Sequence, residues 1–204
     1  MDADSEPTPD LRTRKKLATR EALSRAALRL ALERGLENVR VDDIAAAAGV
    51  SPRTYNNYFS SREEAICALG AERAHRIASA VRERPAGESL AEVILRAMLE
   101  EYAGPAEPEK ATLCLVTSAP ALRGEFLKTI AAIEAPLAEA IAERTGLDAA
   151  LFPRVLAAAV AGAARVATEY WLCSATTAPF ASVLREALTN VAPMASPAPK
   201  GSTC

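Results

Sequence analysis

The sequence predicts an all-α protein of about nine helices, and three observations lead to this prediction. Half of the 204 residues are hydrophobic and alanine dominates, which favours helix because alanine has the highest helix propensity. Apolar residues recur three or four positions apart in several long segments. Prolines lie mostly at the edges of those segments, where helices begin and end. A chain of this length can form one or two compact domains with substantial cores.

The first predicted helix covers residues 11–34 and ends at Gly35. Its apolar residues share one stripe along the helix, made of Leu23, Ala26, Ala27, Leu30 and Ala31. The helix begins with a basic cluster, which is either a solvated helix start or a contact to DNA phosphates or the minor groove. This cluster consists of Arg12, Arg14, Lys15 and Lys16.

The most informative block is 41–59, which reads VDDIAAAAGVSPRTYNNYF. A short helix over 42–48 would bury Ile44, and Gly49 would then adopt the left-handed conformation that ends a helix. Ser51 can cap a second helix, and Pro52 suits its first position. The pattern of helix, tight turn and capped helix predicts a helix-turn-helix, whose second helix enters the DNA major groove.

This block, together with 19–35 before it and 60–69 after it, resembles the tetracycline-repressor (TetR) family over roughly residues 12–70. The resemblance implies a dimeric, all-α, ligand-responsive transcription regulator. Two positions depart from the family pattern: Asn56 stands where an aromatic residue is common, and Ala31 stands where a Phe usually fills the core. The resemblance places the groove contacts at Arg53, Thr54, Asn56, Asn57 and Tyr58, with a cation on the DNA backbone at Arg62.

The residue types suggest how these contacts divide. Arg53 is the best candidate for a bidentate bond to guanine, and Asn56 or Asn57 for one to adenine. Thr54, Tyr58 and Arg62 suit phosphate contacts, although sequence alone does not separate base contacts from phosphate contacts. The alternative interpretation is a solvated polar helix face.

The charge distribution supports a DNA-binding head. Residues 11–62 contain 11 Lys and Arg against five Asp and Glu, whereas residues 63–204 contain 13 against 17, and the net charge of the whole chain is −2. A basic module beside an acidic one fits a head attracted to DNA on a body that is not.

Six further helices are predicted after the helix-turn-helix. The fourth starts after a cap at Ser60 or Ser61, runs to about residue 84 and belongs to both parts of the molecule. The next are 88–102, 110–118 and 120–144, the last with Pro136 inside it, which should kink or divide it. The final two are 148–173 and 179–191. The predicted division is a disordered tail over 1–10, a DNA-binding domain over 11–60, a ligand-binding and dimerisation domain over 61–192 and a disordered tail over 193–204.

The last two helices predict a homodimer. The eighth contains the small-residue run AAAVAGAA at 157–164, which permits close helix approach. The ninth carries an apolar stripe of Phe180, Leu184, Ala187 and Leu188. A pair of such helices suits a two-fold four-helix interface between subunits. Tight packing inside one subunit is the alternative.

A ligand cavity is predicted in the body, because a body of this size exceeds what DNA binding requires. Arg165 lies in an apolar stretch where an unpaired cation is costly, so it either holds an anionic ligand group or pairs with an acid such as Glu169. The candidate lining residues, each of which also suits plain core, are Met98, Phe126, Ile130, Tyr170 and Trp171. Segment 117–147 resembles the C-terminal domain of regulators proposed to sense acyl-CoA-like ligands, such as mycofactocin-system regulators. A drug-sensing or natural-product-sensing efflux regulator, and a DNA-binding protein without any small effector, are the alternatives.

Other functional classes lack sequence support. No catalytic residue, cofactor or metal site is predicted, because the single histidine, His75, has no signalled partners and no phosphate-binding loop or nucleophile motif is present. The four cysteines are scattered without metal-ligand spacing, which suits cytosolic thiols. No membrane span is expected, because no charge-free apolar run reaches about 18 residues, and the acidic N-terminus is unlike a signal peptide. The expected localisation is cytoplasmic.

Overall fold

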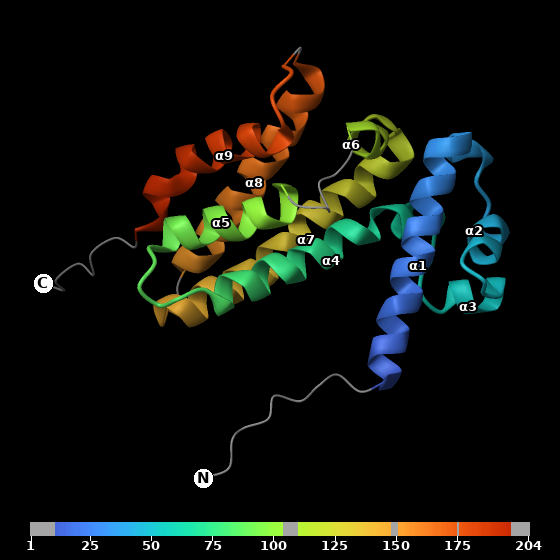
Figure 1. Cartoon of the computed structure of the whole chain (residues 1–204), viewed down its shortest axis with the longest axis horizontal. Coiled ribbons are helices and arrows are strands. Elements are labelled where there is room, and N and C mark those ends of the chain that lie inside the picture. The colour runs from blue at the N-terminus through green and yellow to red at the C-terminus, as the bar shows by residue number, and fades with distance from the viewer. Residues whose placement is uncertain (1–10, 104–109, 148–150, 175, 197–204) are drawn as a thin grey trace, which may run out of the picture. The chain divides into compact units, whose positions relative to one another are not determined.

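The computed structural model describes residues 11–103, 110–147, 151–174 and 176–196, and every regular element in these ranges is helical. The all-α fold predicted from the sequence is therefore confirmed. The elements, labelled in Figure 1, are α1 (Leu11–Arg34), η1 (Leu36–Asn38), α2 (Val41–Ala47), α3 (Pro52–Asn56), α4 (Arg62–Glu83), α5 (Leu90–Ala103), α6 (Lys110–Ser118), α7 (Pro120–Thr145), α8 (Leu151–Cys173), α9 (Phe180–Val191) and η2 (Ala192–Ala195).

The chain forms two compact units, Met1–Leu69 and Gly70–Cys204, so the division falls inside α4 rather than at the start of it. The core of the N-terminal unit is the predicted apolar face of α1, packed against α2 and η1. It includes Leu23, Ala27 and Leu30 of α1, Ile44 of α2 and Tyr55 of α3. Ala31 is also buried, so the site where the family usually carries Phe is filled here by a smaller side chain.

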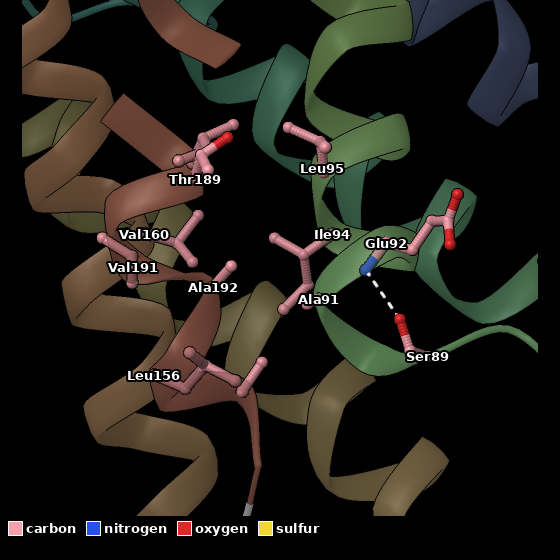
Figure 2. A pocket seen from close by; sticks show the side chains of 12 residues that line it. Ser89, Ala91, Glu92, Ile94, Leu95, Leu156, Val160, Thr189, Val191 and Ala192 are labelled. Atoms are coloured by element: carbon pink, nitrogen blue, oxygen red, sulfur yellow. Dashed lines mark hydrogen bonds between the residues drawn. The ribbon is translucent and has the colours of Figure 1, made fainter. Parts of the chain in front are cut away.

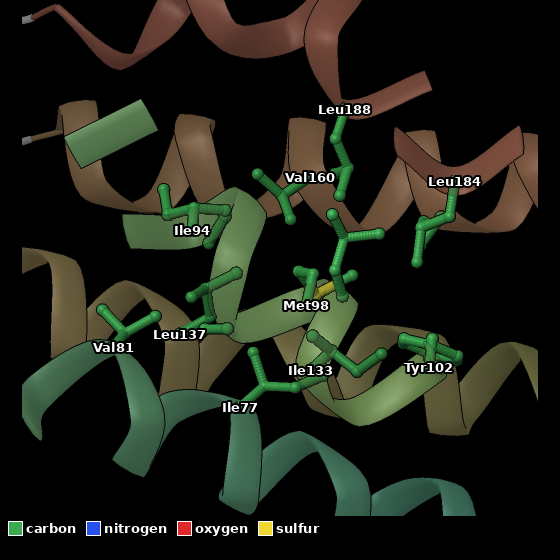
Figure 3. Close-up of a cluster of buried hydrophobic side chains, with 14 of the residues drawn as sticks. Ile77, Val81, Ile94, Met98, Tyr102, Ile133, Leu137, Val160, Leu184 and Leu188 are labelled. Carbon is green, nitrogen blue, oxygen red and sulfur yellow. The ribbon is translucent and has the colours of Figure 1, made fainter. Parts of the chain in front are cut away.

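The C-terminal unit is built on α8, which packs against both α7 and α9, while α9 also packs against α5. Large aliphatic side chains from these helices and from α4 meet in one core (Figure 3). Met98 lies at its centre and is fully buried, as are Ile77, Leu137 and Leu184. The core explains the regular spacing of apolar residues in the sequence, because each helix turns that side inward.

Helix α7 continues through Pro136 without division. The sequence predicted a kink or a break there, and the structure excludes the break. A proline removes one backbone hydrogen bond, but the neighbouring residues Ile133, Leu137, Ala140 and Ile141 are all buried. Their packing holds both halves of the helix in one element.

The C-terminal end is ordered further than the sequence predicted. Residues 192–195 form the short helix η2, which contacts α5, and Ala195 is buried in the core. The first residues of the expected tail, 193–195, are therefore part of the fold, because a small apolar residue anchors this turn. The predicted tail over 1–10 and residues 197–204 lie outside the described residues.

Helix α8 is long and apolar enough, by length and composition, to cross a membrane. Its Leu156, Ala157, Val160 and Ala164 nevertheless pack into the protein core, and its Arg165 forms an ion pair on the surface. These contacts are those of a core helix in a folded helical domain.

Three aromatic rings connect α5, α8 and α9. The Phe180 ring lies 5.5 Å from that of Tyr102 and 5.4 Å from that of Trp171, centroid to centroid. The indole N–H of Trp171 donates to the Ala178 carbonyl at 2.9 Å, and the Lys110 ammonium lies 5.2 Å from the indole centroid. The cluster therefore ties the α8–α9 connection to α5 and α6.

Charged groups join the end of α4 to α5 and α7. Arg84 bonds Glu88 and Glu100, and Arg144 of α7 donates to the Arg84 and Pro85 carbonyls. Arg82 donates to both carboxylate oxygens of Glu143, at 2.6 and 3.0 Å. The hydrogen bond from Arg82, more than the Coulomb attraction, lowers the pKa of Glu143 below its ordinary value.

This lowered pKa predicts a pH-dependent contribution to stability. A carboxylate whose pKa is lower in the folded state stabilises the fold above its unfolded pKa of 4.5, and this contribution is lost as the pH falls through the folded-state pKa. We expect Glu143→Gln to lower the urea midpoint at pH 7 and to have less effect at acidic pH. Glu186→Gln, on an exposed α9 position, is the matched control. An equal loss for Glu143→Gln at both pH values would contradict the assignment.

Candidate DNA-binding site and effector site

The turn between α2 and α3 is fixed by backbone hydrogen bonds that end α2. Gly49 has φ 70°, its N–H donates to Ala46, and the Val50 N–H donates to Ala45 at 2.9 Å. These two bonds form the Schellman motif, which requires a left-handed residue at the position of Gly49. The predicted role of Gly49 is confirmed.

Ser51 caps α3 as the sequence predicted. Its hydroxyl accepts the Thr54 N–H at 3.1 Å and lies 2.9 Å from the Thr54 hydroxyl. Pro52 occupies the first position of the helix, where its missing N–H leaves no bond unmade. The cap orients a short helix whose outer side carries the predicted contact residues.

Those residues are close in space because α3 is only five residues long. Arg53, Asn56 and Asn57 are exposed, whereas Thr54 and Tyr58 are half-buried. Asn57 and Tyr58 follow the last residue of α3, in the turn that leads to Ser60. Thr54 is engaged at the cap, so Arg53, Asn56 and Asn57 are the side chains with the freest access to a base edge.

Tyr55 and Phe59 support this surface from inside. Both are buried, and their ring centroids are 5.8 Å apart. The Tyr55 hydroxyl donates to the Ser61 carbonyl at 2.8 Å. Burial, reinforced by Glu64 and Glu63, raises the pKa of Tyr55 to about 12, so the phenol keeps this proton.

Arg20 is a positioning residue that the sequence analysis did not single out. Its guanidinium lies 4.4 Å from the Phe59 ring centroid, and it donates to the Tyr58 carbonyl at 3.1 Å. The interaction joins α1 to the segment after α3. Its partners are 38 and 39 positions away in the sequence, so spacing along one helix carried no signal for it.

Arg62, predicted to hold the DNA backbone, has partners inside the protein. It donates to the Val39 carbonyl and to the Glu63 carboxylate, both at 2.8 Å. These bonds connect the first residue of α4 to the loop before α2. A phosphate contact by Arg62 therefore requires exchange of at least one of them, and its role on DNA stays a prediction.

The basic cluster at the start of α1 is exposed. Arg12, Arg14, Lys15 and Lys16 are all exposed, and no acidic residue occurs in the first turn of the helix. The cluster is therefore within reach of an anionic partner.

The predicted ligand residues do not form one site. Met98 is fully buried in the core, and Ile130 and Trp171 pack against that core. Tyr170 is 60% exposed. Arg165 is paired with Glu169, with its Nη1 3.0 Å from both carboxylate oxygens, so the ion pair considered as the alternative is present. Phe126 is half-buried on α7.

Among the described residues, cavities adjoin α8 and α9 instead, and two of them are well formed. One, of about 270 Å³, lies between α5, α8, α9 and η2 (Figure 2). The other, of about 350 Å³, is a groove along α8 and α9 that includes Gly162, Ala163, Val166 and Tyr170. Both are mainly apolar in lining.

The predicted dimer stripe on α9 packs within its own chain. Phe180, Leu184 and Leu188 are all buried in the C-terminal core, and Ala187 is half-buried. The stripe does not face a partner subunit, because α5 and α8 already cover it within the chain. Exposed apolar residues lie on α8 instead, at Leu151, Val155, Val166 and Tyr170.

Comparison with known proteins decides the family. Residues 23–66 match the profile described as bacterial regulatory proteins of the tetR family, and residues 84–196 match that of the MftR C-terminal domain. The chain is 34% identical over 180 residues to the HTH-type transcriptional regulator TcmR of Streptomyces glaucescens, covering 83% of this chain and 80% of TcmR. The chain belongs to the TetR family.

Solved structures agree with this TetR-family fold. A putative TetR-family regulator from Rhodococcus sp. is 27% identical, with a TM-score of 0.57 over 85% of this chain and 97% of that one. FadR of Thermus thermophilus, a TetR-family repressor solved with lauroyl-CoA, has a TM-score of 0.57 at 24% identity, over 89% and 100% of the two chains. The chain is thus a transcriptional regulator with a helix-turn-helix and an MftR-like C-terminal domain.

Metal chemistry finds no support among the described residues, where no group of three His, Cys, Asp or Glu side chains is gathered. Cys67, Cys114 and Cys173 are thiols outside any disulfide, and Cys67 is buried. His75 is exposed on α4.

The Schellman turn gives a stability prediction for the N-terminal unit. Gly49→Ala adds a Cβ that meets no atom within 4 Å, so its cost comes from the left-handed backbone alone, about 1–2 kcal/mol. We expect the amides of α2 and α3 to exchange their hydrogens about 5- to 30-fold faster, because the lost stability raises the population of the open state by that factor. Gly124→Ala is the control. Its added Cβ also meets no atom within 4 Å, but Gly124 lies inside α7 and has no positive φ. It should leave the exchange rates of the α2 and α3 amides unchanged. Unchanged exchange in Gly49→Ala would show that the turn tolerates another conformation.

Proposed function

We propose that this TetR-family regulator is a cytoplasmic homodimeric repressor, which binds a near-palindromic DNA operator and is released by a small apolar or acyl-CoA-like effector in its C-terminal unit. The observation that carries the DNA part is the capped α3 with Arg53, Asn56 and Asn57 exposed together. No cofactor is required for this function.

On DNA, α3 lies in the major groove and the three exposed side chains read base edges. Arg53 suits guanine, and one of the asparagines suits adenine. Thr54, Tyr58 and Arg62 contact phosphates, and the basic cluster of α1 adds sequence-independent attraction. Two α3 helices of a dimer then read half-sites about one helical turn or a small multiple apart.

Base-specific and general contacts should respond differently to mutation. Arg53→Ala or Asn57→Ala should cost about 1–3 kcal/mol at particular base pairs. Arg62→Ala should weaken binding to all sequences, whereas Arg29→Ala, an exposed α1 cation paired with Glu33, is the control. Gel-shift titration against upstream genomic DNA and random duplexes measures both effects. Equal affinity of the unmodified protein for the two DNAs would contradict a sequence-specific regulator.

The dimer rests on the outer side of α8. Leu151, Val155, Val166 and Tyr170 are exposed at 75, 44, 52 and 60%, and the groove beside Val166 also runs along α9. Exposed apolar side chains that line up on one helix mark an interaction surface, and an isologous two-fold contact places the same surface on both subunits. The small residues Gly162 and Ala163 allow close approach there.

A charge on this surface should separate the subunits. Val166→Glu or Ala163→Glu should give a monomer with native helix content, and should lose operator affinity because two linked half-sites bind far more tightly than one. Leu127→Glu, at a similarly exposed α7 position, should stay dimeric. Light scattering measures the mass. Leu188→Glu should instead destabilise the fold of each subunit, since the Leu188 side chain is buried. A monomeric unmodified chain at micromolar concentration would end the proposal.

The effector proposal is supported by the match of residues 84–196 to the MftR C-terminal domain and by the size of the C-terminal unit. A ligand relieves repression only through its difference in affinity for the free and DNA-bound conformations. Helix α4 is continuous from one unit into the other. A ligand that tilts α4 from the C-terminal unit would therefore change the position of α3 on DNA. The second candidate, a drug or natural-product sensor, is favoured by the mainly apolar cavities.

Acyl chain length separates these candidates. Palmitoyl-CoA should weaken operator binding by about 5–150-fold, the range of a coupling free energy of about 1–3 kcal/mol, and butyryl-CoA should do less. Arg165→Ala tests whether the Arg165–Glu169 pair opens to hold an anionic group, and Arg185→Ala on α9 is its control. Fluorescence anisotropy of labelled operator measures release. Release that does not depend on chain length would favour the drug sensor, and no release by any ligand would favour a regulator without an effector.

A further inference from the structure

The cavity between α5, α8, α9 and η2 has a mainly apolar lining that contains no Lys or Arg. It has a volume of about 270 Å³ and is partly open to solvent. Its apolar wall comes from three helices, with Ile94 and Leu95 on α5 facing Val160 on α8 and Val191 at the end of α9 (Figure 2). Three alanines, Ala91, Ala192 and Ala195, line it where larger side chains would fill it.

The polar groups at this cavity are few and mostly engaged. Ser89 accepts the Glu92 N–H at 3.3 Å, and Figure 2 shows the Glu92 carboxylate turned away from the cavity. That carboxylate bonds Arg96 at 2.6 Å. The Thr189 hydroxyl, which donates to the Arg185 carbonyl at 2.8 Å, retains lone pairs that can accept a bond from a ligand. The lining therefore offers two neutral hydroxyls, those of Ser89 and Thr189, and no cation.

We propose that this cavity is a binding site for a compact, uncharged, mainly apolar molecule of one or two fused rings that donates one hydrogen bond to Thr189. Its size supports this class, since a cavity of about 150 Å³ lined by apolar side chains holds benzene and drug-sized pockets begin at about 300 Å³. An anionic group is disfavoured by its desolvation, because no cation lines the cavity. The site is thus distinct from that of the acyl-CoA-like effector, whose phosphates need cations.

The location of the site also predicts that a bound ligand stabilises the fold. Its floor is the buried part of α8, and its rim is η2, which is held by the buried Ala195. A ligand that fills the space replaces missing contacts between α5 and α9, so binding should stabilise the C-terminal unit. The inference names a ligand class and a site within the proposed C-terminal function, but binding here does not depend on any change in DNA affinity.

The test uses the full-length protein without DNA and measures 2-naphthol binding by isothermal titration calorimetry. Ala91→Phe fills the cavity from α5 and should abolish measurable binding, as should Ala192→Leu from the opposite wall. Thr189→Val keeps the shape but removes the acceptor, and should weaken binding about two- to tenfold. Ala131→Phe, on an exposed position of α7, is the control and should bind as the unmodified protein does. Circular dichroism establishes that each variant is folded.

The ligand class is tested with 2-naphthoate, which has the same rings and an ionised carboxylate. It should bind at least about tenfold more weakly than 2-naphthol. The proposal is overturned if 2-naphthol fails to bind, if folded Ala91→Phe and Ala192→Leu bind it normally, or if 2-naphthoate binds equally well. It is also overturned if Thr189→Val leaves the affinity unchanged. None of these outcomes depends on operator binding, so they leave the repressor proposal to its own experiments.

Discussion

The hydrogen bond from the Tyr55 hydroxyl to the Ser61 carbonyl is the interaction on which the N-terminal unit depends. Tyr55 is the largest fully buried side chain of that unit, and it connects the short helix α3 to the residue before α4. A helix of five residues has little stability by itself, so tertiary contacts must hold it. The ring packs on Phe59, Arg20 covers Phe59 from α1, and the phenol remains protonated because of its raised pKa. The exposed side chains of α3 are oriented by this buried framework.

The C-terminal unit uses α8 in two ways. Leu156, Ala157, Val160 and Ala164 turn toward α5, α7 and α9 and form the core, while Val166 and Tyr170 remain exposed. The alanines of α8 permit this arrangement, because their small side chains let the neighbouring helices pack closely against its buried side. The same property leaves space where alanines meet, as in the cavity lined by Ala91, Ala192 and Ala195.

Much of the local structure was predictable from the sequence because its determinants are local. The bounds of α1 and α6 were predicted to the residue, and the roles of Gly49 and Ser51 follow from backbone geometry within four or five positions. The errors arose where the determinant was distant. The α9 stripe was assigned to a second subunit because a sequence does not tell which neighbour covers an apolar face. For Arg165 the sequence left a ligand role and an ion pair with Glu169 open, and the ion pair, which spans one helical turn, is present. Neither Arg20 on Phe59 nor the small cavity at η2 has a sequence signature.

The position of Trp171 gives the protein a built-in optical probe of one unit. It is the single tryptophan of the chain, and it lies in the C-terminal unit, against Phe180 and beneath Lys110, with its N–H bonded to Ala178. Excitation selective for indole therefore reports on the connection between α8 and α9, while the helix-turn-helix remains spectroscopically silent. Emission during denaturation follows only the C-terminal half, and its comparison with backbone circular dichroism separates the unfolding of the two units without any label.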